Sequence, residues 1–186
     1  MNLPRIDLLS LRRYIDNEYM EDGYAVIHIN LYQEYELFDP LSYGRQKQIN
    51  QEIIDYIDRR SAIIPTTIPL KVIFHGKDIT EDDQENIKKC IKEHYTVAMY
   101  DKQWDKRINR RKIIALTALG LSVLGVYVLH AISGEENMRT EILSIIASFS
   151  LWEAVDLFLL ERKSLQKELW DLAQLVSQRI EFQFDP

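Results

Sequence analysis

Two long apolar stretches dominate the hydrophobic pattern of this chain. The first runs from Ile113 to Ser133 without a formal charge, and the second, Ile142–Leu160, is mostly apolar. As helices they would measure roughly 31 Å and 28 Å, about the thickness of a bilayer's hydrocarbon core. The alternative is a buried helical hairpin in a soluble protein, but the rest of the chain has too little apolar surface to cover it. The pattern therefore predicts a two-helix transmembrane hairpin, 113–133 and 142–160, with a linker at 134–141.

Positive charges flank this hairpin on one side. Cations precede the first span and follow the second at Lys102, Lys106, Arg107, Arg110, Arg111, Lys112, Arg162, Lys163 and Lys167, whereas the linker has Arg139 among three glutamates. Loops rich in Lys and Arg stay in the cytosol. We therefore expect a multi-pass protein of the cell membrane with both termini cytosolic. The net charge of -6 argues against general nucleic-acid binding, which depends on neutralising phosphates.

Small residues form stripes on both predicted spans. They recur at spacings of three or four, as Ala118, Ser122 and Gly125 on the first helix and Ser144 and Ser148 on the second. Such stripes allow membrane helices to approach closely. The stripes predict where the helices pack.

Two carboxylates, Glu153 and Asp156, lie three residues apart on one face of the second span. A charge at the bilayer centre costs about 2.5–3.5 kcal/mol, and less near the edge. We expect Asp156 to form an ion pair with Arg111 or Lys112. Glu153 lies near the depth of Thr117, without a cation, and is protonated, bonded to a neighbouring helix or exposed to water between subunits. Each option favours a homo-oligomer or another membrane protein as partner, in addition to the lipid bilayer.

Residues 1–79 carry the pattern of a small α/β domain. Alternating apolar positions predict strands over 24–32 and 68–75. Helical stripes surround them at Leu8, Leu11, Ile15 and Tyr19, and at Ile49, Ile53, Ile54 and Ile57.

Helical extensions connect this domain to the spans. Thr80 is a suitable N-cap for a stalk helix over 80–112 that continues into the bilayer. Beyond the second span, 161–186 has a helical seam at Leu165, Leu169, Leu172 and Val176, and then a strand at 180–184. Because two strands make a marginal sheet, we expect this third strand to complete it. The predicted fold is a cytosolic α/β domain plus a transmembrane hairpin with helical stalk extensions.

Candidate chemistry is sparse. His28 and His75 would be neighbours if their strands pair, but a metal site needs more ligands and a supporting second shell. His94 and Cys90 lie a turn apart without a metal-binding spacing, so we predict no metal and no cofactor. The single cysteine allows no disulfide within the chain and suits a reducing compartment.

No sequence motif of an enzyme is present: the chain has no GxGxxG, Walker A lysine or GxSxG. The polar sheet face could bind a small ligand or lie under the first helix; its members are His28, Asn30, Tyr32 and Lys71. We expect a non-catalytic oligomerising scaffold, sensor or partner-binding module. The alternative is a small oligomeric channel or transporter that uses Glu153 and Asp156.

Overall fold

The computed structural model describes residues 18–31, 36–44, 47–76, 79–134 and 138–184. The chain divides into two compact units: a sheet unit, Met1–Met99 with Trp170–Pro186, and a helical unit, Tyr100–Leu169. The elements in chain order are β1 (Met20–Glu21), β2 (Tyr24–Asn30), α2 (Gln51–Ser61), β3 (Leu70–His75), α3 (Glu81–Ile132), α4 (Met138–Asp156), the π-helix η2 (Leu157–Glu161), α5 (Arg162–Val176) and β4 (Arg179–Gln183). The predicted stripe at Leu8, Leu11 and Ile15, and Tyr32, lie outside the described residues.

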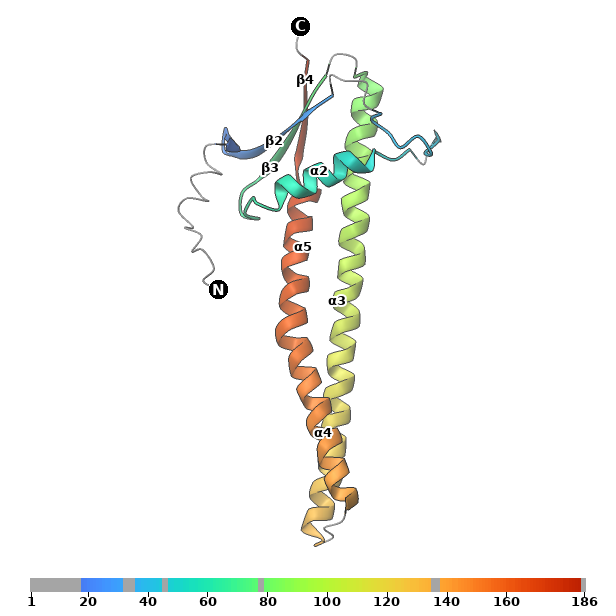
Figure 1. Ribbon diagram of the computed structural model, residues 1–186, viewed down its shortest axis with the longest axis vertical. Helices are drawn as coiled ribbons and strands as arrows, with labels where there is room; N and C mark the ends of the chain where they lie inside the picture. Colours follow the sequence, from blue (N-terminus) through green and yellow to red (C-terminus); the bar gives the residue numbers. More distant parts are fainter. Residues whose placement is uncertain (1–17, 32–35, 45–46, 77–78, 135–137, 185–186) are drawn as a thin grey trace, which may run out of the picture. The chain divides into compact units, whose positions relative to one another are not determined.

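A mixed four-stranded sheet, in the order β1-β2-β3-β4, forms the centre of the sheet unit (Figure 1). β2 and β4 both run parallel to β3, with Ile27 opposite Val72 and Phe74 opposite Phe182. The three strands predicted from alternation are therefore present, including the C-terminal strand that extends the sheet. β1 was not predicted: it is two residues long and joins β2 through a turn with positive φ at Asp22 and Gly23.

The alternation of the strands builds the hydrophobic core on the helical side of the sheet. Its buried members include Ala25, Ile27 and Ile29 of β2, Leu70, Val72 and Phe74 of β3, Ile53, Ile54 and Ile57 of α2, and Ile87, Ile91 and Tyr95 of α3. Phe182 of β4 stacks on Phe74 with 5.5 Å between ring centroids. Full burial of each large apolar side chain contributes about 1.5–3 kcal/mol.

Polar side chains fix the ends of these elements. Asn50 caps α2 by accepting a hydrogen bond from the Glu52 N–H at 3.0 Å. Thr80, as predicted, caps α3 by accepting from the Asp83 N–H at 3.2 Å. Near the end of α5, the buried Gln174 amide donates to the carbonyls of Pro65 and Ile68 at 3.1 and 2.7 Å. These bonds attach the C-terminal segment to the loop that enters β3.

Tyr95 is the largest fully buried side chain of the core and carries a polar group. It is 1% exposed, and its hydroxyl donates to the Asp58 carboxylate at 2.9 Å. Burial, and then the charge of Asp58, raise the pKa of Tyr95 above its ordinary value. The folded state therefore keeps the phenol protonated at a pH where the unfolded chain ionises.

The Tyr95→Phe variant should lose about 1 kcal/mol of unfolding free energy at neutral pH, because one hydrogen bond disappears. A raised folded pKa contributes stability that is present below the unfolded value, about 10, and is lost as pH rises toward the folded value. Wild type should therefore weaken above about pH 10, and Tyr95→Phe should weaken less. Pulse proteolysis in urea measures both, with Tyr43→Phe, 92% exposed, as the control. Equal alkaline slopes in wild type and Tyr95→Phe would contradict this assignment.

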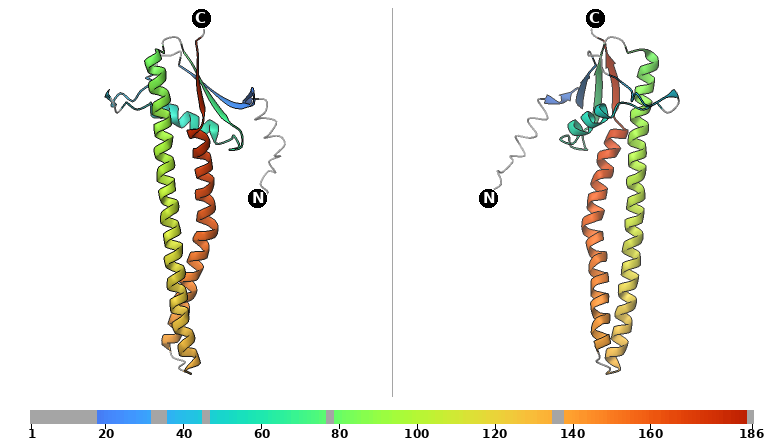
Figure 2. Two further views of the ribbon diagram at one scale, coloured as in Figure 1. Left: turned by 180° about the vertical axis from the view of Figure 1, so that it is seen from behind. Right: turned by 45° about the vertical axis from the view of Figure 1, so that its right-hand side comes forward.

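In the helical unit, α4 lies alongside the C-terminal part of α3 (Figure 2). The less exposed positions of α3 recur at spacings of four and three: Asn109, Ile113, Leu116, Gly120, Val123 and Tyr127. Those of α4 include Thr140, Leu143, Ala147, Ser150 and Ala154. A repeat of 3.5 residues is the pattern of a coiled-coil seam.

Two helical segments, α3 and the continuous run Met138–Val176 that comprises α4, η2 and α5, are long and apolar enough to cross a membrane. Their most apolar windows have mean hydropathies of 2.1 and 1.8, yet the chain buries just 6% and 17% of these windows. Outside the seam, large apolar side chains such as Leu129 and Phe149 are exposed. The core helix of a soluble domain would instead be mostly buried.

The predicted small-residue stripe lies on another face of α3. Ala118, Ser122 and Gly125 are exposed, Ser148 of α4 is exposed and Ser144 is partly buried. The close approach occurs at Gly120, where a Cβ would lie 2.7 Å from Cγ of Leu151. The reason is the seam's repeat, which passes through Leu116 and Gly120 and leaves the stripe to one side. The positions of the small residues alone did not show which face of α3 contacts α4.

Candidate functional site

The polar positions predicted in the second span belong to the helical unit. Glu153 is partly buried and Asp156 is exposed, both in the last turns of α4, and Thr117 of α3 is partly buried. Among the described residues, the side chains of these three make no hydrogen bond or ion pair. The carboxylates of Glu153 and Asp156 therefore lie in the apolar part of the helical unit, and no described residue forms a hydrogen bond or an ion pair with either of them.

The cations named as partners of Asp156 do not pair with it. Arg111 and Lys112 are exposed, and neither forms an ion pair with a described residue. Among the described residues of this unit, the ion pair that forms joins Lys102 of α3 to Glu168 of α5 at 2.6 Å. This hydrogen bond raises the pKa of Lys102 and lowers that of Glu168. Because both side chains remain partly exposed, the pair contributes little to stability.

A buried amide and a π-helix meet at the cytosol-proximal end predicted for the second span. Asn109 is 3% exposed, and its Nδ2 donates to the Leu157 carbonyl at 3.5 Å. Its Oδ1 has no partner among the described residues. Leu157 also begins η2, whose i+5 bond comes from the Arg162 N–H. A buried Asn in a seam fixes the register of helix pairing, and sequence reasoning missed it because Asn109 lies within a basic run.

In the sheet unit, the pairing of β2 with β3 brings two histidines together. His28 Nδ1 and His75 Nε2 are 2.8 Å apart, and His28 Nε2 is 3.2 Å from Oε1 of Glu21. The prediction that these histidines become neighbours when the strands pair is confirmed. One consistent assignment has His28 donating to Glu21 and His75 donating to His28. The described residues contain no group of three or more His, Cys, Asp or Glu placed to hold a metal ion.

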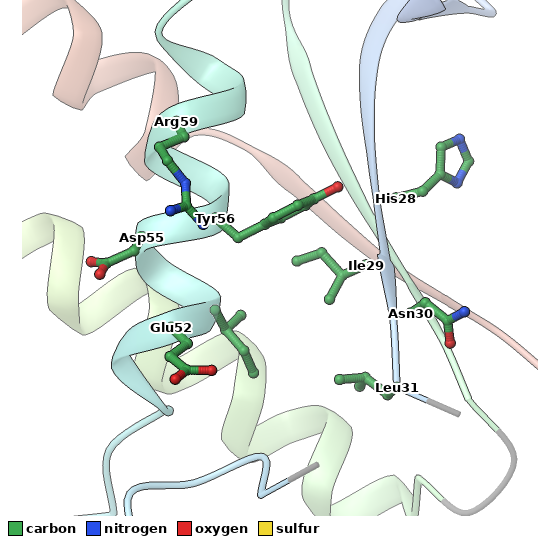
Figure 3. Close-up of a pocket in the computed structure, with 9 residues that line it drawn as sticks. His28, Ile29, Asn30, Leu31, Glu52, Asp55, Tyr56 and Arg59 are labelled. Carbon is green, nitrogen blue, oxygen red and sulfur yellow. The ribbon is translucent and has the colours of Figure 1, made fainter. Parts of the chain in front are cut away.

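A cavity of about 520 Å³ lies between β2 and α2. Figure 3 shows Ile29 and Leu31 on the side that faces α2, the Tyr56 ring directed toward β2, and His28 and Asn30 directed away. The cavity is lined by His28, Ile29, Asn30, Leu31, Glu52, Ile53, Asp55, Tyr56 and Arg59. Its volume lies in the range of small-ligand sites, with an apolar floor and a few polar groups.

This cavity differs from the polar sheet face considered from the sequence. That face carries His28, Asn30 and Lys71, of which Lys71 pairs with Glu181 at 3.6 Å. The cavity lies on the helical side of β2. His28 and Asn30 also contribute to its lining, and its other polar groups, Glu52, Asp55, Tyr56 and Arg59, come from α2. The sequence feature that could have indicated this cavity is the set of α2 residues outside its apolar stripe, namely Glu52, Asp55, Tyr56 and Arg59.

Comparisons with protein-family models, with curated proteins and with solved structures found no match. In the cavity, the carboxylates of Glu52 and Asp55 and the guanidinium of Arg59 can recognise polar groups, and Ile29 and Leu31 supply apolar contact. In the helical unit, the candidate functional groups are the carboxylates of Glu153 and Asp156, which lie among apolar side chains.

Proposed function

We propose that this chain is a two-pass membrane protein that holds its sheet unit in the cytosol, where it acts as a non-catalytic scaffold, sensor or partner-binding module. One observation carries the proposal: the apolar windows of α3 and of the helical segment Met138–Val176 are 6% and 17% buried by the chain itself. Apolar surface left in water costs about 25 cal/mol per Å². A bilayer removes that cost along both helices.

The sheet supports an even number of crossings. β3 precedes the first apolar helix and β4 follows the second, yet β4 pairs with β3 in one sheet. If both helices cross the bilayer, these neighbouring strands require both ends of the hairpin to lie on one side. The Lys and Arg residues on both flanks support the cytosolic side.

Partner binding has support in each unit. In the sheet unit, the cavity between β2 and α2 offers an apolar floor with polar groups at its rim. In the helical unit, Glu153 is partly buried without a hydrogen bond to a described residue. Because two helices cannot enclose a polar side chain, a homo-oligomer or another membrane protein would supply its remaining contacts.

The alternative is an oligomeric channel or transporter that uses Glu153 and Asp156. The observation in its favour is that neither carboxylate is neutralised by a cation of the described segments. Ionisable groups inside membrane proteins often mark ion or proton pathways.

Glu153→Gln distinguishes the two functions. In proteoliposomes, the scaffold function predicts no proton or cation flux above empty vesicles, for wild type or for the variant. It also predicts that Glu153→Gln shifts the particle mass in nanodiscs toward the monomer, since an interhelical contact is weakened. Glu141→Gln, exposed at the start of α4, is the matched control. Wild-type flux that disappears in Glu153→Gln while the particle mass is unchanged would support the transport function instead.

A further inference from the structure

Positive charge is concentrated in two segments of the helical unit that flank the apolar helices. α3 carries cations at Lys106, Arg107, Arg110, Arg111 and Lys112, and α5 carries them at Arg162, Lys163 and Lys167. Neither stretch, 106–112 on α3 or 162–167 on α5, contains an Asp or Glu. This excess contrasts with the net charge of -6 for the whole chain. We call these eight cations the basic collar.

Contacts between the two helices place both halves of the collar in one layer. Lys102 pairs with Glu168 at 2.6 Å, and Asn109 contacts the Leu157 carbonyl at 3.5 Å. On the α5 side these two contacts lie roughly 16 Å apart and enclose its three collar cations. On α3 they lie roughly 10 Å apart, on either side of Lys106 and Arg107. Arg110, Arg111 and Lys112 continue to the first residue of the apolar stretch. The collar itself measures roughly 9 Å along α3 and roughly 8 Å along α5, close to the thickness of about 5–8 Å that the polar headgroup region adds on each side of the hydrocarbon core.

The collar is also available for contact. Seven of its members are exposed, Lys106 being partly buried, and none forms an ion pair with a described residue. Arg162 lies over the Phe158 ring at 5.1 Å, which leaves its guanidinium hydrogen bonds unused. Unneutralised cations within one Debye length of a bilayer surface attract anionic headgroups.

We propose that the basic collar binds the anionic phospholipid headgroups of the bilayer that the hairpin crosses. The proposal rests on the proposed membrane insertion and goes beyond orientation, because it requires selective enrichment of anionic lipid around the protein. The charge of the collar, its exposure and its position beside the apolar helices are complementary to that ligand.

The test is lipid selectivity of the full chain reconstituted in phosphatidylcholine vesicles, measured by the motional restriction of spin-labelled lipids. We expect spin-labelled phosphatidylglycerol to be restricted more than spin-labelled phosphatidylcholine. The preference should weaken between about 0.05 and 0.5 M NaCl, as screening increases. Arg110→Gln with Arg111→Gln should reduce the preference at least about twofold. Arg110→Lys with Arg111→Lys, which keeps the charge, should retain most of it.

A distant double variant, Lys89→Gln with Lys92→Gln, removes two charges from the sheet-unit part of α3 and should leave the preference unchanged. Equal restriction of both lipids by inserted wild type would overturn the proposal. So would a preference abolished by inorganic phosphate but not by NaCl of equal ionic strength, because the collar would then bind free anions. A chain that is extracted from the vesicles by alkaline carbonate would instead contradict membrane insertion, so the two failures are distinguishable.

Discussion

A chain that ends at Gln178 should lose the protease resistance of its sheet unit. The truncation removes β4, which pairs with β3 from Lys71–Arg179 to His75–Gln183. It also removes Phe182, whose ring stacks on Phe74 at 5.5 Å. The loss of two partly buried apolar side chains, Ile180 and Phe182, and of the backbone hydrogen bonds to β3 should lower the free energy of unfolding by about 3–6 kcal/mol. That is comparable to the whole stability of a typical domain, about 5–15 kcal/mol.

Point variants separate the contribution of the core from that of chain length. Phe182→Ala should lower the unfolding free energy by about 2–3 kcal/mol, because it removes a ring packed on the core. Phe184→Ala, 49% exposed, should change it little and is the matched control. Pulse proteolysis in urea measures all three chains. A truncated chain with wild-type protease resistance would mean that β4 does not stabilise the sheet.

Gly120→Leu should separate the two long helices. A Cβ at Gly120 would meet Leu151 at 2.7 Å to Cγ, 2.8 Å to Cδ2 and 3.3 Å to the backbone nitrogen. Since helix backbone atoms cannot yield as a side-chain end does, the seam must open, at a cost of about 1–3 kcal/mol or more. The distance between spin labels placed at exposed positions of α3 and α4 should increase and its distribution broaden.

Gly125→Leu provides the matched control for this substitution. It introduces the same side chain five positions later in the same helix, where a Cβ meets nothing within 4 Å. We expect an unchanged interhelical distance, because that face does not contact α4 in the chain. If Gly125→Leu rather than Gly120→Leu opens the pair, the small-residue stripe predicted from the sequence is the true contact face.

Regular patterns made much of this fold predictable. The alternation around Ile27, Val72 and Phe182 predicted β2, β3 and β4, and Thr80 marked the start of α3. The apolar stretches predicted helices long enough to cross a membrane, because an uninterrupted run of about 20 apolar residues can be recognised directly in the sequence. Each of these features is local, so it can be recognised without knowing which segments meet.

Features that depend on the pairing of distant segments were not predicted. The face that α3 presents to α4 depends on the phase of a seam through Asn109 and Gly120, which no single helix specifies. The predicted partnership of Asp156 with Arg111 or Lys112 rested on depth alone, and the structure pairs Lys102 with Glu168 instead. The cavity beside α2 likewise requires β2 and α2 to be placed together. The Asp22–Gly23 turn was a local signal for β1 that could have been used.

Topology mapping by thiol accessibility tests the central claim most directly. In a Cys90→Ser background, single cysteines replace Met138, Leu124 and Gln166, and a membrane-impermeant maleimide is added to intact and to permeabilised cells. We predict labelling of Met138→Cys in intact cells, labelling of Gln166→Cys after permeabilisation alone, and little labelling of Leu124→Cys in either. Labelling of Met138→Cys only after permeabilisation, or equal labelling of all three positions in a soluble fraction, would contradict a two-pass protein with cytosolic ends.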